Sequence, residues 1–282
     1  MVATDGDSNS SSFRLIPTAL ASATAASLAR IPVHPIDSVK SLLQASREPT
    51  SLLEVLRKNS LSSLYRGLSI AVVGSIPAGA LYFTTYEITK SALQHESKPI
   101  AHFAAGMTAE AVSCFLWLPI DVVKERRQVQ VDQNLYKNDF DALRRIYYSP
   151  GGIRALYRGY FATLFSFGPF TGVYFTVYEA LKKRLSERPG HATTLAMGAF
   201  SGAIAAFITT PLDMIKLRLQ VQSATHDFQY KGFWNGLRST IASQGVFGMF
   251  RGAGARVGFH VPSAALSITL YEAFKREFHS LL

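Results

Sequence analysis

The sequence predicts an all-α membrane protein in which six transmembrane helices, built from three tandem repeats of about 92 residues, form a pseudo-threefold bundle around a central cavity. Only 17 % of the 282 residues are charged and 48 % are apolar, whereas a soluble domain usually has about a quarter charged residues. The apolar segments are interrupted by Gly, Ser, Thr and Pro. Such segments suit helices around a polar cavity, where protein or water can satisfy the freed backbone groups.

Three sets of landmarks indicate the repeat. The motif Pro-x-Asp-x-x-Lys begins at Pro35, Pro119 and Pro211. An aromatic-Arg-Gly motif begins at residues 65, 157 and 250, and the motif Tyr-Glu-x-x-Lys begins at residues 86, 178 and 271. We therefore divide the chain into a polar tail at 1–12 and repeats at 13–95, 96–188 and 189–282.

Each repeat predicts two long helices joined by a polar connector. The first helices are expected at 14–43, 101–128 and 194–220, each kinked at its motif proline, because a proline inside a helix loses a hydrogen bond and clashes with the preceding turn. The connector contains a short amphipathic helix, for example at 140–148. The second helices are expected at 68–93, 160–185 and 253–278. Six crossings place both termini on one side of the membrane.

Composition and charge exclude several classes of protein. The single cysteine, Cys114, rules out an intrachain disulfide framework. The first twelve residues are neither a secretory signal nor an Arg-rich transit peptide, so any targeting signal is internal. The net charge of +10 is concentrated beside the apolar segments, which fits lipid headgroups or an anionic solute better than nucleic acid. No nucleophile–base or metal constellation is present, so we expect no enzyme, cofactor or metal site.

The repeated charges predict two rings of ion pairs at opposite ends of the cavity. An Asp and a Lys three residues apart share one face of a helix, so the Asp of one repeat can meet the Lys of the next. The first ring, called the Asp–Lys ring, pairs Asp37 with Lys124, Asp121 with Lys216, and Asp213 with Lys40, braced by Gln44, Gln128 and Gln220. The second, called the Tyr–Glu ring, pairs Glu87 with Lys182, Glu179 with Lys275, and Glu272 with Lys90, braced by Tyr86, Tyr178 and Tyr271.

The two rings cannot both stay closed if a solute is to pass, so we interpret them as alternating gates. The alternative is that these charges are solvated helix ends, each pair contributing a few tenths of a kcal/mol. All six copies contain both the acid and the base, which favours the gates.

These motifs resemble the mitochondrial carrier family over about Phe13 to Phe278. The family pattern Pro-x-Asp/Glu-x-x-Lys/Arg-x-Lys/Arg-x-Gln is complete in repeats 2 and 3, whereas repeat 1 has Leu42 at the second basic position. The resemblance implies a monomer of the mitochondrial inner membrane that exchanges solutes, with the Asp–Lys ring on the matrix side and the Tyr–Glu ring on the cytoplasmic side. It also implies cardiolipin contacts at helix starts that favour anions, namely Gly67, Gly159, Gly252 and Gly232.

Residues that differ between the repeats are the candidates for binding an asymmetric solute. On the first helices they are Arg30, Glu110 and Trp117. On the second helices, where members of the family hold substrate, they are Gly74, Ser75, Ser166, Phe167, Phe259 and His260, with Tyr82 and Tyr174 nearer the Tyr–Glu ring. This mixture suits an aromatic and zwitterionic solute.

Two groups within the family are similar to parts of the chain. S-adenosylmethionine carriers are similar over 109–128 and at Gly74-Ser75, but have Arg-Glu where Ser166-Phe167 stands. Mitoferrins are similar around 35–40 and 261–264, but their cavity histidines correspond to Arg30, Gly79 and Tyr174, so the usual imidazole metal ligands are absent. Nucleotide and amino-acid transport remain alternatives, as does a scaffold protein that has lost transport.

Overall fold

The structure is a computed structural model that describes residues 24, 27–46, 48, 50–93, 97–130, 135–185, 190–225, 230–263 and 266, and these residues form helices and turns without a strand. The elements are α2 (Arg30–Ala45), α3 (Leu52–Lys58), the 3-10 helix η1 (Ser63–Tyr65), α4 (Leu68–Ala92), α5 (Lys98–Val129), α6 (Asp139–Tyr147), α7 (Gly152–Leu156), α8 (Tyr160–Leu185), α9 (His191–Ile208), α10 (Thr210–Thr225) and α11 (Phe233–Gly248). The chain is helical again over 253–263.

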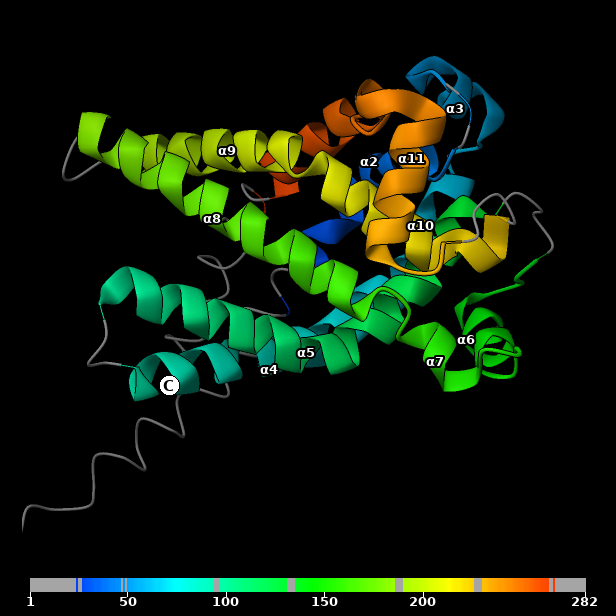
Figure 1. Ribbon diagram of the computed structural model, residues 1–282, viewed down its shortest axis with the longest axis horizontal. Helices are drawn as coiled ribbons and strands as arrows, with labels where there is room; N and C mark the ends of the chain where they lie inside the picture. The colour runs from blue at the N-terminus through cyan, green and yellow to red at the C-terminus, as the bar shows by residue number, and fades with distance from the viewer. Residues whose placement is uncertain are drawn as a thin grey trace, which may run out of the picture.

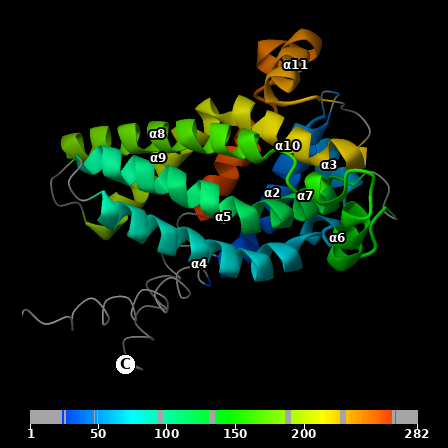
Figure 2. The ribbon, with the colours of Figure 1, turned by 60° about the horizontal axis from the view of Figure 1, so that its bottom comes forward.

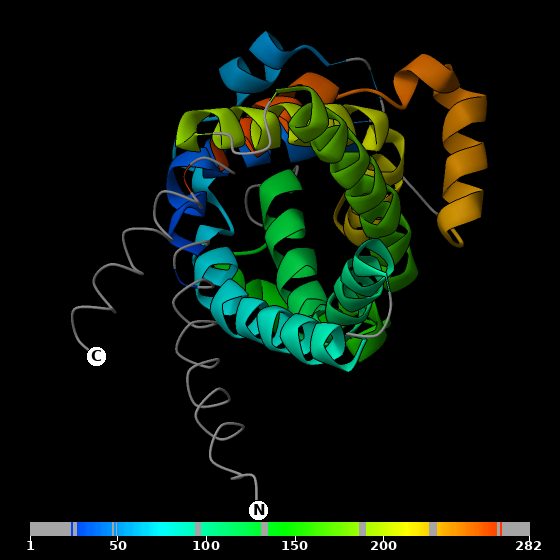
Figure 3. The same ribbon diagram turned by 90° about the vertical axis from the view of Figure 1, so that its left-hand side faces the viewer.

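The long helices α4, α5, α8 and α9 run along the longest axis of the molecule, and the short helices α3, α6, α7 and α11 lie together at one end (Figures 1 and 2). Viewed along the bundle, the long helices are arranged in a ring (Figure 3). Helices α2, α5 and α10 carry the three Pro-x-Asp-x-x-Lys motifs, and each of them contacts the other two. The three motifs are therefore brought together at the end that holds the short helices.

Among the described residues, two helical stretches are long and apolar enough to cross a membrane, Ser63–Ala92 and Ile100–Val129. The bent pair Ala192–Ile208 and Thr210–Gln222 adds a third if it counts as one crossing. Two of the predicted crossings, at 14–43 and 253–278, extend into residues outside the described ranges. The predicted bounds at 160–185 and 68–93 agree with α8 and α4, and the predicted connector helix at 140–148 agrees with α6 to within one residue.

The first helix of repeat 3 differs from the prediction of a single kinked helix. It is broken at Thr209 with a bend of 65°, whereas α2 and α5 continue through Pro35 and Pro119. Pro211 cannot donate to the preceding turn, and the Thr209 and Thr210 hydroxyls donate to the carbonyls of the two alanines before the break, at 2.7 Å each. These hydroxyl bonds satisfy the carbonyls at the break, as membrane helices require.

A glycine at the start of each second helix allows close contact between repeats. Gly67 has a φ of 78°, and a Cβ atom there would lie 3.0 Å from the Lys124 carbonyl oxygen in the motif of repeat 2. Gly159 and Gly252 are equivalent: both have positive φ, and they lie against Gln220 and Gln44 of the following motif in cyclic order. Glycine is therefore required here for backbone conformation and for packing against the next motif.

Gly252→Ala is expected to lower the free energy of unfolding by about 1–2 kcal/mol, because a left-handed conformation costs that much for a residue with a Cβ. The added Cβ would also lie 3.1 Å from the Gln44 side chain. Gly254→Ala is the matched control, since nothing lies within 4 Å of that position and its φ is not positive. The thermal unfolding temperatures of both variants in detergent test this prediction, and equal values would contradict it.

Candidate functional site

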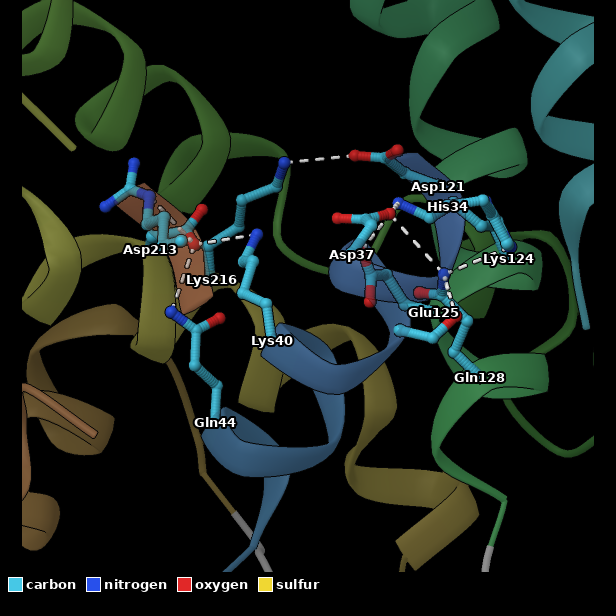
Figure 4. A network of polar contacts seen from close by, with 12 residues as sticks. His34, Asp37, Lys40, Gln44, Asp121, Lys124, Glu125, Gln128, Asp213 and Lys216 are labelled. Atoms are coloured by element: carbon cyan, nitrogen blue, oxygen red, sulfur yellow. Dashed lines mark hydrogen bonds and ion pairs between the residues drawn. The ribbon is translucent and has the colours of Figure 1, made fainter. Parts of the chain in front are cut away.

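The Asp–Lys ring is closed in this structure. Lys124 Nζ lies 2.6 Å from Asp37 Oδ2. The ammonium groups of Lys216 and Lys40 each lie 3.0 Å from a carboxylate oxygen, of Asp121 and Asp213 respectively. Each pair runs from one motif helix to the next (Figure 4), and these are the three pairings that the repeat predicted. Because the side chains are 7–18 % exposed, the pairs are stronger than solvated surface pairs.

Two of the three motif glutamines brace the ring. Gln44 donates to Asp213 at 3.3 Å, and Gln128 donates to Asp37 at 3.4 Å. Gln220 differs, because its buried Nε2 has no hydrogen-bond partner among the described residues. The predicted threefold bracing is therefore incomplete at the Asp121–Lys216 pair.

The second basic residue of the motif joins the repeats below the ring. Arg126 Nε donates to the Gln220 carbonyl oxygen at 2.9 Å, and Arg218 Nε donates to the Gln44 carbonyl oxygen at the same distance. The equivalent residue of repeat 1 is Leu42, which cannot donate.

At the seam between repeats 1 and 2, a neutral side chain takes the place of the arginine: the Gln128 amide donates to the Ser38 hydroxyl at 3.0 Å. Ser38 and His34 are themselves hydrogen-bonded within repeat 1, to backbone carbonyl oxygens of residues 64 and 66. The Asp139 carboxylate of repeat 2 also accepts from the Ile70 N–H of repeat 1, at 3.2 Å. The departure of repeat 1 from the motif thus changes how this seam is held.

An apolar layer follows the ring. It consists of Ala45, Val129 and Val221, each directly after a motif glutamine, together with Leu217. All four are almost completely buried. The sequence could have predicted this layer, because three of its four residues directly follow a repeated glutamine. The prediction of the gate used only the charged residues and the glutamines. Ion pairs and this layer together close the bundle at this end.

The opposite end shows no closed ring among the described residues. Lys90 lies 3.4 Å from Glu87 on its own helix. Tyr86 does not brace an ion pair, since its hydroxyl bonds to His102 Nδ1 at 2.6 Å. Glu179 and Lys182 are exposed, with no ion pair between Glu87 and Lys182. Of the predicted Tyr–Glu ring, Tyr271, Glu272 and Lys275 lie outside the described residues.

The predicted Glu87–Lys182 pair is therefore wrong for this conformation. The physical reason is that Glu87 has a partner on its own helix, because Lys90 three residues later shares its face of the helix. The Asp–Lys ring is thus closed while the one Tyr–Glu pair that lies wholly among the described residues is not formed, as alternation requires.

A cavity of about 270 Å³ lies above the Asp–Lys ring. Seven predicted solute-binding residues line it: Arg30, Glu110, Trp117, Ser166, Phe167, Phe259 and His260. The guanidinium of Arg30 lies 4.7 Å from the Trp117 ring centroid, a cation–π contact.

Five further residues line the cavity that were not among the predicted site residues: His34, Glu125, Thr163, Phe170 and Arg256. Thr163, Phe170 and Arg256 lie one helical turn from predicted residues, so helical periodicity could have found them.

Four predicted solute-binding residues do not line this cavity. Gly74 packs against α5, where an added Cβ would lie 2.7 Å from the Ile120 side chain, and the Ser75 hydroxyl bonds to Ser27. These two positions belong to helix packing because their face of α4 is turned towards other helices. Tyr82 and Tyr174 lie nearer the open end, in two aromatic columns.

The first aromatic column runs from Tyr86 through Tyr82 to Phe167, with successive ring centroids 6.4 Å apart. The second runs through Tyr178, Tyr174, Phe170 and His260, with centroids 5.2–6.4 Å apart. Both columns lead from the Tyr–Glu end to the cavity.

A family model described as mitochondrial carrier protein matches residues 11–97, 95–189 and 187–281. The chain belongs to the mitochondrial carrier family. This match confirms the predicted triple repeat and the all-α carrier fold, and it identifies the chain as a transporter of solutes rather than an enzyme.

Several curated relatives of this carrier are about one-third identical to it. Mitochondrial substrate carrier family protein E of Dictyostelium discoideum is 35 % identical over 93 % of this chain and 96 % of its own. The mitochondrial S-adenosylmethionine carrier protein of Xenopus tropicalis is 33 % identical over 83 % of this chain and 85 % of its own. Mitoferrin of Dictyostelium discoideum is 32 % identical over 86 % of this chain and 88 % of its own.

Lys124→Ala is expected to abolish solute exchange in proteoliposomes. It leaves the buried carboxylates of Asp37 and Glu125 without their ammonium partner, and breaking one partner of a buried pair costs about 3–5 kcal/mol. Lys58→Ala is the matched control, because it removes an exposed pair with Glu54 on α3. If Lys124→Ala retains full exchange, the Asp–Lys ring is not a gate.

Proposed function

We propose that this carrier exchanges an S-adenosylmethionine-like solute, with an aromatic base and a zwitterionic end, across the mitochondrial inner membrane. The observation that carries the proposal is the lining of the cavity. Acidic and basic side chains are equal in number there, and they stand beside four large aromatic side chains. Six of the charges neutralise one another in the Asp–Lys ring, which leaves Arg30, Arg256, Glu110 and Glu125.

A balanced set of charges favours a solute that carries both signs over a polyphosphate. Arg30 and Arg256 can bind a single anionic group, while Glu110 and Glu125 oppose a multiply charged one. The acids also attract an ammonium or sulfonium group, and aromatic faces bind cations when water is excluded. Trp117 and Phe167 offer such faces as well as stacking surfaces for a base.

Alternating access follows from the two ends of the bundle. The Asp–Lys ring and its apolar layer form the matrix gate, which is closed, and the Tyr–Glu ring forms the cytoplasmic gate, in which the Glu87–Lys182 pair is not formed. A bound solute opens the closed ring only if it binds the open-ring conformation more tightly. Three largely buried pairs hold the ring strongly enough to stay closed without solute, and the intact ring favours a transporter over a scaffold.

Similarity supports the S-adenosylmethionine class, although Ser166-Phe167 departs from the pair expected for it. The relatives named above include such a carrier. They also include a mitoferrin, which keeps metal ions as a second candidate. Metal transport is less favoured, because His34 is bonded to a backbone carbonyl and His260 is stacked on Phe170. No group of three possible metal ligands occurs in the part of the chain that the structure describes.

The proposal includes cardiolipin at the ends of the short helices and a monomeric carrier. The support is that helix starts favour anions and that Arg66, Arg158 and Arg251 directly precede the glycines at these starts. At the start of α4 the Ile70 N–H already donates to a carboxylate, that of Asp139. The glycines there have a packing function already, so cardiolipin binding would use the same turns without requiring glycine.

A thermal-shift screen should show that S-adenosylmethionine raises the unfolding temperature of the detergent-solubilised carrier, since a ligand of the folded state stabilises it. Phe167→Ala should reduce this shift by at least half, because the cavity loses one aromatic face. Phe165→Ala is the matched control: Phe165 lies on the same helix but outside the cavity, stacked on Phe233. A response restricted to divalent metals or to nucleotides would contradict the proposed cargo.

A further inference from the structure

Three residues that line the cavity each have a buried polar atom without a hydrogen-bond partner among the described residues: Ser166 Oγ, Arg256 Nε and Glu125 Oε2. Their residues are 4–6 % exposed. A buried polar atom without a partner costs about 1–3 kcal/mol, and native proteins contain few of them. Three in one cavity indicate groups that a bound solute satisfies.

Arg256 is held at one edge of its guanidinium group. One terminal nitrogen, Nη1, donates to the Ala206 carbonyl oxygen at 3.0 Å. Arg256 Nε lies 3.4 Å from Asp213 Oδ2, a charge contact whose geometry is not that of a hydrogen bond. The guanidinium carbon lies 5.9 Å from the Phe170 ring centroid. Arg256 is therefore held at the wall of the cavity through Nη1, while its other terminal nitrogen, Nη2, makes no hydrogen bond among the described residues.

Ser166 lines the same cavity as Arg256. It precedes Phe170 by one turn of α8, so the two side chains share one face of the helix. Phe170 lies beside Arg256 and also stacks on His260, with ring centroids 5.2 Å apart. Phe170 thus connects the Ser166 face of α8 to the guanidinium group of Arg256.

We propose that Arg256 and Ser166 form the subsite for the carboxylate of the solute, an inference that rests on the proposed zwitterionic cargo. The guanidinium fork matches a planar carboxylate, and charge-assisted hydrogen bonds are the stronger kind. The residues equivalent to Arg256 in repeats 1 and 2 are Ala71 and Thr163. This donor is therefore unrepeated, as binding of an asymmetric solute requires.

The same contact links solute binding to the ring. Asp213 accepts from Lys40 at 3.0 Å and from Gln44 at 3.3 Å, and it lies in charge contact with Arg256 at 3.4 Å. A carboxylate bound to Arg256 competes with Asp213 for the guanidinium charge. It therefore weakens the attraction that holds repeat 3 in the closed ring, and by linkage an open ring binds the carboxylate more tightly.

The experiment compares solute pairs that differ in one anionic group. The probes are S-adenosylmethionine with its decarboxylated analogue, arginine with agmatine, histidine with histamine, and adenosine monophosphate with adenosine. Exchange into proteoliposomes and binding by thermal shift are measured for the wild type, Arg256→Gln, Arg256→Lys and Ser166→Ala. Arg145→Gln removes an exposed guanidinium on α6 and is the matched control.

The wild type should prefer the carboxylate member of at least one amino-acid pair by about tenfold or more, which is about 1.4 kcal/mol. Arg256→Gln should abolish this preference by weakening binding of the carboxylate member at least tenfold more than binding of the decarboxylated member, Arg256→Lys should restore part of the preference, and Arg145→Gln should keep it. Ser166→Ala should reduce it.

Different results distinguish this subsite from the proposed cargo. Preference for arginine over agmatine without any response to S-adenosylmethionine would refute the cargo and support the subsite. A preference confined to the phosphate pair, or no preference in any pair, would overturn the carboxylate subsite. Full preference in Arg256→Gln, with an unchanged unfolding temperature, would overturn it as well.

Discussion

Closure of this bundle depends on three lysine–aspartate contacts that are withdrawn from water. Charges in such an environment are tolerated only when each has a partner. Each motif helix therefore needs both of the other two, one to pair with its aspartate and one to pair with its lysine. The glycines at 67, 159 and 252 and the break at Thr209 bring the motif helices close enough for these contacts. The apolar layer after the motif glutamines excludes water from the side of the ring that faces away from the cavity. This lowers the local dielectric constant and strengthens the attraction between the paired lysines and aspartates.

The repeat is the reason why the Asp–Lys ring could be predicted from the sequence. Three equivalent helices around one axis turn a local spacing, such as Asp121 to Lys124, into a contact between repeats. The same reasoning predicted the Tyr–Glu ring, but in the structure Glu87 pairs with Lys90 of its own helix and not with Lys182. A sequence encodes the contacts of every conformation that the chain visits, whereas one structure contains the contacts of a single conformation.

The cavity was predictable only in part. Seven of the predicted residues line it, but Gly74 and Ser75 face neighbouring helices, since the rotation of a helix about its axis is decided by packing. Arg256 and Glu125 are single residues without copies, so no symmetry drew attention to them. The break at Thr209 depends on hydroxyls that satisfy carbonyls near Pro211, and Pro35 and Pro119 show that proline alone does not specify it.

Leu42 makes the three seams of the bundle unequal below the ring. Two seams are crossed by an arginine that donates to a backbone carbonyl, and the third by the neutral Gln128–Ser38 bond. Hydrogen bonds from a charged donor are roughly twice as strong as neutral ones. The seam between repeats 1 and 2 also has the shortest contact of the ring, Lys124 to Asp37 at 2.6 Å, and the Asp139 carboxylate accepts from the Ile70 N–H across it. Opening of the ring therefore breaks a different set of contacts at each seam, so the three repeats are not mechanically equivalent.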